Sequence, residues 1–73
     1  MRRNMKAERA RNGMTIDQVA ERIGVSRNAV SRWENDISSP STNNLMALCQ
    51  LYGVSPEYLL DKTDERHGAL VSA

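Results

Sequence analysis

Two short segments with helix-start signals lie on either side of Gly24 and constrain the fold more than any other feature. The first segment follows Thr15, whose hydroxyl can form a capping box with Gln18. Its apolar stripe consists of Val19, Ala20 and Ile23. The second, Arg27–Glu34, follows the N-cap candidate Ser26. Because Gly24 can adopt the left-handed conformation that ends a helix, the pattern predicts two helices of about two turns, packed at a steep angle.

Three residues restrict this geometry further. Ala20 faces the next helix, where a larger side chain would push the pair apart, and Gly24 allows the backbone to turn. Val30 fills the angle from the second helix. Trp33, three residues after Val30, could stack on a nucleic acid, but this spacing favours packing in the core.

Glycine, proline and capping residues divide the rest of the chain into helical lengths. We expect a helix at residues 4–12 before Gly13, one that begins after Ser41 or Thr42 and ends at Gly53, and one at residues 56–60. The sequence therefore predicts an all-α domain of five helices over residues 1–60. Residues 61–73 are largely polar, and we expect them to form a frayed, flexible tail.

The composition argues against an enzyme. A chain of 73 residues forms one small domain and encloses no deep active site. Cys49, the only cysteine, lies on an apolar stripe, and His67, the only histidine, lies in the expected tail. This inventory leaves no disulfide, no metal site and no nucleophile–base pair, so we expect no cofactor. No apolar run approaches the roughly 20 residues that span a bilayer, and we expect a cytoplasmic protein without membrane contact.

The charge distribution is uneven along the chain. Residues 1–35 hold eight Lys or Arg against four Asp or Glu, a balance of +4, whereas residues 36–73 hold two against five, a balance of −3. Such an excess is either a solvated face or a surface for nucleic acid, and charge alone does not decide between them. Any nucleic-acid surface should lie in the first half.

The stretch TIDQVAERIGVSRNAVSRWEN, residues 15–35, resembles the Xre-type helix-turn-helix family, which includes lambdoid phage repressors and Cro proteins. Pro40-Ser41 and the run from Leu51 to Ser55 also match in order and spacing, so the resemblance covers Met5 to Leu60. It implies a repressor-like DNA-binding domain whose third helix enters the major groove.

The resemblance places the candidate base-reading residues on the third helix. They are Ser26, Arg27, Asn28 and Arg32. Arg can hold guanine O6 and N7, and Asn can hold adenine N6 and N7. A cation at Arg27 opposes the helix dipole at a cost of about 0.3–1 kcal/mol, which favours a functional explanation. Outside this motif, an exposed polar face would indicate only solubility.

Phosphate contacts are expected from the start of the second helix and from scattered basic and polar residues. The candidates are Arg2, Arg3, Lys6, Thr15, Asn35, Ser38 and Ser39. The chain departs from the family pattern at Ile16, where a phosphate-binding Gln is common, and at Asp36, which would repel phosphate. We therefore expect modest affinity per monomer.

The resemblance also implies a partly buried ion pair between Glu34 and Arg9. Relatives bind paired half-sites through twofold symmetry, so a homodimer on a palindromic operator is expected. Tyr58 and Leu60 are either its interface or ordinary core residues, and composition does not separate the two.

The leading hypothesis is a bacterial or phage-encoded transcriptional repressor that acts by occupying an operator in double-stranded DNA. The alternative is an antitoxin or adaptor whose main partner is another protein, with autoregulatory DNA binding. A neighbouring toxin gene would favour the second, and divergent phage or mobile-element genes the first. An enzyme is the third hypothesis, and the composition argues against it.

Overall fold

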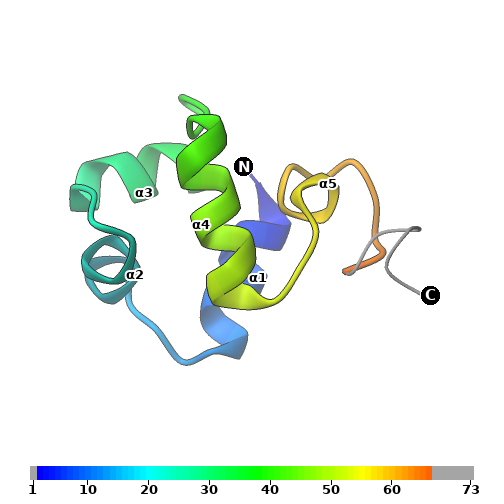
Figure 1. The fold of residues 1–73 in the computed structure, drawn as a ribbon, viewed down its shortest axis with the longest axis horizontal. Helices are drawn as coiled ribbons and strands as arrows, with labels where there is room; N and C mark the ends of the chain where they lie inside the picture. Colours follow the sequence, from blue (N-terminus) through cyan, green and yellow to red (C-terminus); the bar gives the residue numbers. More distant parts are fainter. Residues whose placement is uncertain (1, 67–73) are drawn as a thin grey trace.

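A computed structural model describes residues 2–66 and contains five helices within them, joined by short loops (Figure 1). These are α1 (Arg3–Arg11), α2 (Ile16–Ile23), α3 (Arg27–Glu34), α4 (Thr42–Tyr52) and α5 (Pro56–Leu59). The described part of the chain has no strand, and the prediction of an all-α, five-helix fold is confirmed. Met1 and residues 67–73, which include His67, lie outside the described residues.

Local capping determines where α2 and α3 begin. The Thr15 hydroxyl accepts a hydrogen bond from the Gln18 amide at 3.1 Å, and the Gln18 side chain accepts one from the Thr15 amide at 2.8 Å. Ser26 accepts from the Ala29 amide at 3.2 Å. Between the helices, Gly24 is left-handed with φ 76°. Both helices therefore have the predicted bounds, whereas α1 and α5 each differ by one residue at their ends.

The core lies where α2 and α3 meet α4, which crosses in front of α1 in Figure 1. Val19, Ala20, Val30 and Trp33 are buried together with α4 side chains and Leu59. Trp33 is only 5% exposed, so its role is packing rather than stacking on a ligand. Cys49 is buried as well, and burial raises the pKa of its thiol.

The N-terminus of α1 is capped by a residue from the other end of the domain. Arg2 precedes the helix and its side chain forms no cap. Instead, the Asp61 carboxylate accepts from the backbone amides of Arg3 at 2.9 Å and Asn4 at 3.0 Å. A carboxylate at this position also interacts favourably with the helix dipole. Asp61 itself has φ 61°, which brings its side chain back toward α1.

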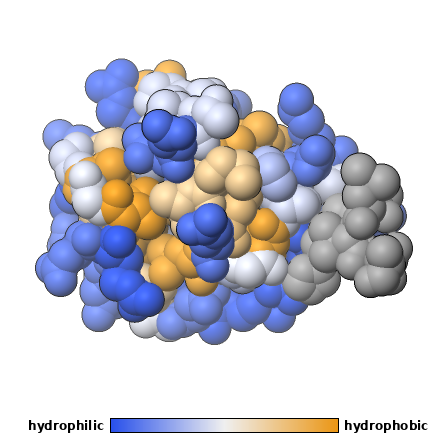
Figure 2. Space-filling model, in the orientation of Figure 1, coloured by the Kyte–Doolittle hydropathy of each residue, from blue (hydrophilic) through white to orange (hydrophobic). Residues whose placement is uncertain are grey.

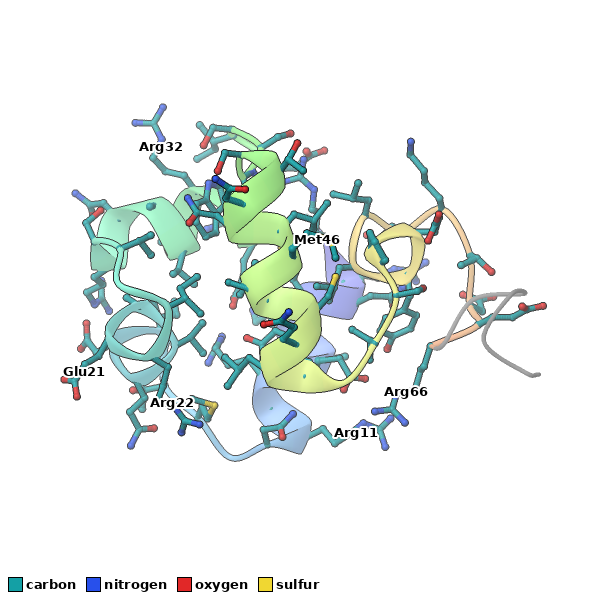
Figure 3. The ribbon with its side chains drawn as sticks, in the orientation of Figure 1. Arg11, Glu21, Arg22, Arg32, Met46 and Arg66 are labelled. Carbon is teal, nitrogen blue, oxygen red and sulfur yellow. The ribbon has the colours of Figure 1, made fainter. Side chains whose placement is uncertain are left out.

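Residues 61–66, the described part of the segment that we expect to fray, contact the body of the domain. Arg66 donates from Nε and Nη2 to Glu8 of α1 at 2.9 and 3.0 Å, and the Ser55 amide donates to the Arg66 carbonyl at 2.6 Å. Figure 3 shows Arg66 beside Arg11, which also contacts Glu8, at 3.3 Å. These polar side chains are held because Glu8, fully buried, requires charged partners.

Tyr58 lies in the core, which favours the second of the two roles that the sequence left open for it. It is 6% exposed, and its hydroxyl donates to Glu8 at 3.0 Å. Leu60 is half-buried against the core.

Candidate nucleic-acid interface

The outer face of α3 presents the predicted base-reading residues to solvent. Arg27, Asn28 and Arg32 are all exposed, as is the cap residue Ser26. On the opposite face Val30 and Trp33 are 2% and 5% exposed, so α3 is held by one side and free on the other. Arg32 extends away from the body of the domain in Figure 3.

Arg27 has a partner that sequence reasoning missed. Its Nε lies 2.9 Å from Oδ1 of Asp17, in the first turn of α2, and both side chains are largely exposed, at 62% and 70%. An exposed pair of this kind contributes about 0–1 kcal/mol, which is comparable to the dipole cost of a cation at this position. The positive charge of Arg27 at the N-terminus of α3 therefore no longer favours a functional explanation by itself.

The N-terminus of α2 offers less to a phosphate than expected. The capping box occupies the amides of Thr15 and Gln18, which leaves those of Ile16 and Asp17 without an acceptor within residues 2–66. Ile16 packs against the core, and the Asp17 carboxylate lies in the same turn. Thr15 remains exposed at this end.

Arg2 is a structural residue rather than the surface cation that we expected. It is 9% exposed, and its Nη1 donates to the carbonyls of Trp33 and Ser38 at 2.7 and 2.9 Å. Its Nη2 donates to Ser39 Oγ at 2.7 Å and lies 3.1 Å from Asp36. Arg2 therefore cannot reach a phosphate without giving up these bonds, and it fastens the loop that follows α3.

The other phosphate candidates fall into two groups. Arg3 and Lys6 are exposed on α1, which is far from α3 in the sequence. The second group follows the end of α3 and consists of Asn35, Ser38 and Ser39. The Asn35 side chain donates to the Ser31 carbonyl at 2.9 Å, so part of its hydrogen-bonding capacity is used within α3.

The ion pair between Arg9 and Glu34 joins α1 to the last residue of α3. The Arg9 guanidinium donates to both carboxylate oxygens, at 2.7 and 3.0 Å, and also to the Met14 carbonyl at 3.2 Å. The hydrogen bonds to Glu34 raise the pKa of Arg9. Tyr52 lies in the same environment, where burial and the Glu34 charge raise its pKa to about 12.

Two short helices joined at Gly24, with α3 free on one face, are matched by a family model described as helix-turn-helix, over residues 5–59. The chain belongs to the Xre-type helix-turn-helix family. The matched range agrees with the extent of the resemblance that the sequence indicated.

Several curated proteins are similar to this helix-turn-helix domain. The HTH-type transcriptional regulator ImmR of Bacillus subtilis is 36% identical over 62 residues, which cover 85% of this chain and 49% of that protein. Antitoxin PezA of Streptococcus pneumoniae is 40% identical over 53 residues, 73% of this chain and 34% of the antitoxin. Repressor protein C2 of Salmonella phage P22 is 33% identical over 60 residues, 82% of this chain and 28% of the repressor.

The helix-turn-helix chain thus spans about half the length of ImmR, and less of the other two relatives. No solved structure gives a significant match. Within residues 2–66, none of the helices has the length and apolar character that crossing a membrane requires. The same residues contain no group of three or more His, Cys, Asp or Glu that could hold a metal ion.

Proposed function

We propose that this domain binds double-stranded DNA in a sequence-specific manner through α3 and acts as a transcriptional repressor by operator occupancy. The observation that carries the proposal is the two-sided character of α3. Val30 and Trp33 anchor one face, and Arg27, Asn28 and Arg32 lie exposed on the other. Similarity to the transcriptional regulator ImmR supports a role in regulation, and similarity to repressor protein C2 of phage P22 supports repression.

The exposed side chains have the chemistry for base recognition. Arg can donate two hydrogen bonds to guanine O6 and N7, and Asn can donate to and accept from adenine. Each such pair discriminates against a wrong base by about 1–3 kcal/mol. The Arg9–Glu34 ion pair and the bonds of Arg2 support the end of α3, so the reading side chains project from an anchored helix.

The departures at Ile16 and Asp36 argue for paired binding. Ile16 offers no polar group to the backbone, and the 60%-exposed Asp36 carboxylate, although paired with Arg2, brings negative charge beside α3. A homodimer on a palindromic operator would compensate for modest affinity per monomer, with half-sites about 34–36 Å apart. With Tyr58 buried, Leu60 is the remaining interface candidate from α5 and its C-cap.

Selection of bound sequences from random duplex DNA tests the proposal directly. A specific reader enriches a palindrome, and its affinity falls steeply with salt because phosphate contacts release counterions. Arg32→Ala should relax preference at one base-pair position per half-site, whereas Lys6→Ala should weaken all sequences about equally. Lys62→Ala, at an exposed residue beyond α5, serves as the control. Failure to enrich any sequence would refute the proposal.

A second candidate is an antitoxin whose main partner is a protein. The 40% identity to PezA favours it. The second observation is the apolar surface around Met46 of α4, a side chain that is 45% exposed (Figures 2 and 3). Copurification with the product of a neighbouring gene, lost in Met46→Glu but retained in Arg32→Ala, would support this function over operator binding alone.

A further inference from the structure

We propose that Arg2 is a positioning residue for DNA binding that acts through the loop after α3, residues 35–41. It holds this loop so that the Asp36 carboxylate is drawn toward the guanidinium, and a DNA phosphate meets the Ser39 hydroxyl instead. Arg2 itself contacts no DNA. This inference rests on the proposed function, because it requires the loop after α3 to approach a phosphate.

The Arg2 guanidinium is fixed by hydrogen bonds on both terminal nitrogens. Nη1 donates to the carbonyls of Trp33 and Ser38 at 2.7 and 2.9 Å, and Nη2 donates to Ser39 Oγ at 2.7 Å. The backbone amide of Arg2 also donates to the Glu34 carbonyl, at 2.8 Å. Because guanidinium donors form a rigid planar fork, these bonds define both the plane of the group and the path of the loop.

Asp36 lies where a carboxylate is unfavourable by itself. It follows Asn35, the C-cap of α3, and has φ 59°, in the left-handed region that residues with a Cβ rarely adopt. The negative end of the helix dipole disfavours an anion at this position as well. Oδ1 of Asp36 lies 3.1 Å from Nη2 of Arg2, and both residues line a hollow together with Leu60 and Asp61. The carboxylate is thus drawn back toward the start of α1.

The same arrangement leaves Ser39 as a donor. Its Oγ accepts from the guanidinium, so the hydroxyl proton is available to another acceptor, and it has none within residues 2–66. Ser39 is exposed, and serine hydroxyls commonly donate to phosphate oxygens. With Arg2 in place, the loop therefore offers a hydroxyl to a phosphate. Without Arg2, the Asp36 carboxylate is free to turn toward the phosphate and repel it.

Arg2→Lys separates this role from that of charge alone. Lys keeps the positive charge, but a single ammonium cannot hold carbonyls, a hydroxyl and a carboxylate in the geometry of the fork. A carboxylate that moves to about 4 Å from a phosphate weakens binding by roughly fivefold in water. We expect Arg2→Lys to lose about this much affinity for duplex DNA, although the net charge of the chain is unchanged. Adding Asp36→Asn should restore the affinity.

The experiment measures the affinity of the full chain for a selected operator and for random duplex DNA. It compares the wild type with Arg2→Lys, Asp36→Asn and the double variant, under conditions in which urea denaturation shows each to be folded. Arg2→Gln is the second replacement of Arg2 and should be rescued by Asp36→Asn in the same way. Since phosphates carry no sequence information, the loss should be equal for operator and random DNA.

Arg22 provides a matched control. It is an exposed arginine of α2, has no ion-pair partner within residues 2–66, and lies apart from Arg32 in Figure 3. Arg22→Lys makes the same replacement away from the loop and should leave the affinity unchanged. In that background, as in the wild type, Asp36→Asn should raise the affinity only slightly.

The outcomes separate the inference from the proposed function. A larger gain from Asp36→Asn in the Arg2→Lys background than in the wild type supports the inference. Equal gains in the two backgrounds, wild-type affinity in Arg2→Lys, or a loss that Asp36→Asn does not rescue would each overturn it. In those cases a wild-type chain that still enriches a palindrome keeps its proposed function. A wild-type chain that enriches no sequence refutes the proposed function, and the inference fails with it.

Discussion

Glu34, the last residue of α3, is held at both carboxylate oxygens by Arg9 of α1, with Nε–Oε2 and Nη2–Oε1 distances of 2.7 and 3.0 Å. Both side chains are largely buried, at 5% and 16% exposed. Two charges at this depth stabilise the fold only as a pair, because each alone would keep its desolvation cost. The pair thus joins the end of α3 to α1, and removing either partner should lower the free energy of unfolding markedly.

Glu34→Gln should therefore lower the free energy of unfolding by about 3 kcal/mol, the lower end of the range for a broken buried pair, since Gln retains one acceptor. Urea denaturation measures the change. Glu21→Gln removes an exposed carboxylate and should leave the midpoint almost unchanged. Equal denaturation midpoints for the wild type and Glu34→Gln would mean that the ion pair does not stabilise the fold.

Gly24 permits a test of the turn itself. Its φ is 76°, and an added Cβ would meet no atom within 4 Å, so substitution carries a backbone cost without a steric clash. Gly24→Ala should cost about 1–2 kcal/mol of stability, whereas Gly24→Asn should cost less because Asn tolerates this conformation. Denaturation of the two variants side by side distinguishes them. An equal or larger loss of stability in Gly24→Asn would contradict the interpretation that the cost comes from the backbone conformation alone.

The features that sequence analysis predicted correctly are local ones. The caps at Thr15 and Ser26 join residues three positions apart, so the residues themselves indicate where α2 and α3 begin. The buried face of α3 follows from the spacing of Val30 and Trp33. Helical periodicity and capping chemistry act over a single turn, and a pattern within one turn is visible in the sequence.

The features that sequence analysis missed join residues that are far apart in the sequence. Asp61 caps α1 across 57 and 58 positions, and Arg66 reaches Glu8 across 58. A polar residue near the end of a chain resembles a solvated one until its partner is known, which is why the segment was expected to fray. Arg2 was misassigned for the same reason, because an N-terminal cation carries no sign of the carbonyls that surround it. The Asp17–Arg27 pair depends on the angle between two helices.

Acid should weaken the fold through Glu8. Burial alone would raise the pKa of Glu8, but hydrogen bonds from Arg66 and Tyr58 hold it below its ordinary value of 4.5. A lowered pKa means that the folded state favours the carboxylate, so this stabilisation is present above pH 4.5 and is lost as the pH falls through the lowered value. Thermal melting across the acid range should show this loss in the wild type, and a smaller one in Glu8→Gln.

Arg66→Ala provides the counterpart. Without its main hydrogen-bond donors the buried Glu8 should have a higher pKa, because desolvation then dominates. The acid loss of stability should begin at a higher pH than in the wild type. An Arg66→Ala variant with the wild-type acid profile would show that residues 61–66 do not hold Glu8 in solution.

Tyr52 should respond at the opposite end of the pH scale. Burial and the neighbouring Glu34 charge raise its pKa from 10.0 to about 12, although Arg9 partly opposes this. A raised pKa means that the folded state favours the neutral phenol. Its contribution to stability is therefore complete below pH 10.0 and is lost as the pH rises through about 12.

In a Tyr58→Phe variant, which leaves Tyr52 as the single tyrosine, tyrosinate absorbance should have its midpoint near 12 while the protein stays folded. Tyr52→Phe should weaken the alkaline loss of stability seen by melting. A midpoint at the value of free tyrosine in the folded protein would contradict burial of Tyr52 beside the Arg9–Glu34 pair.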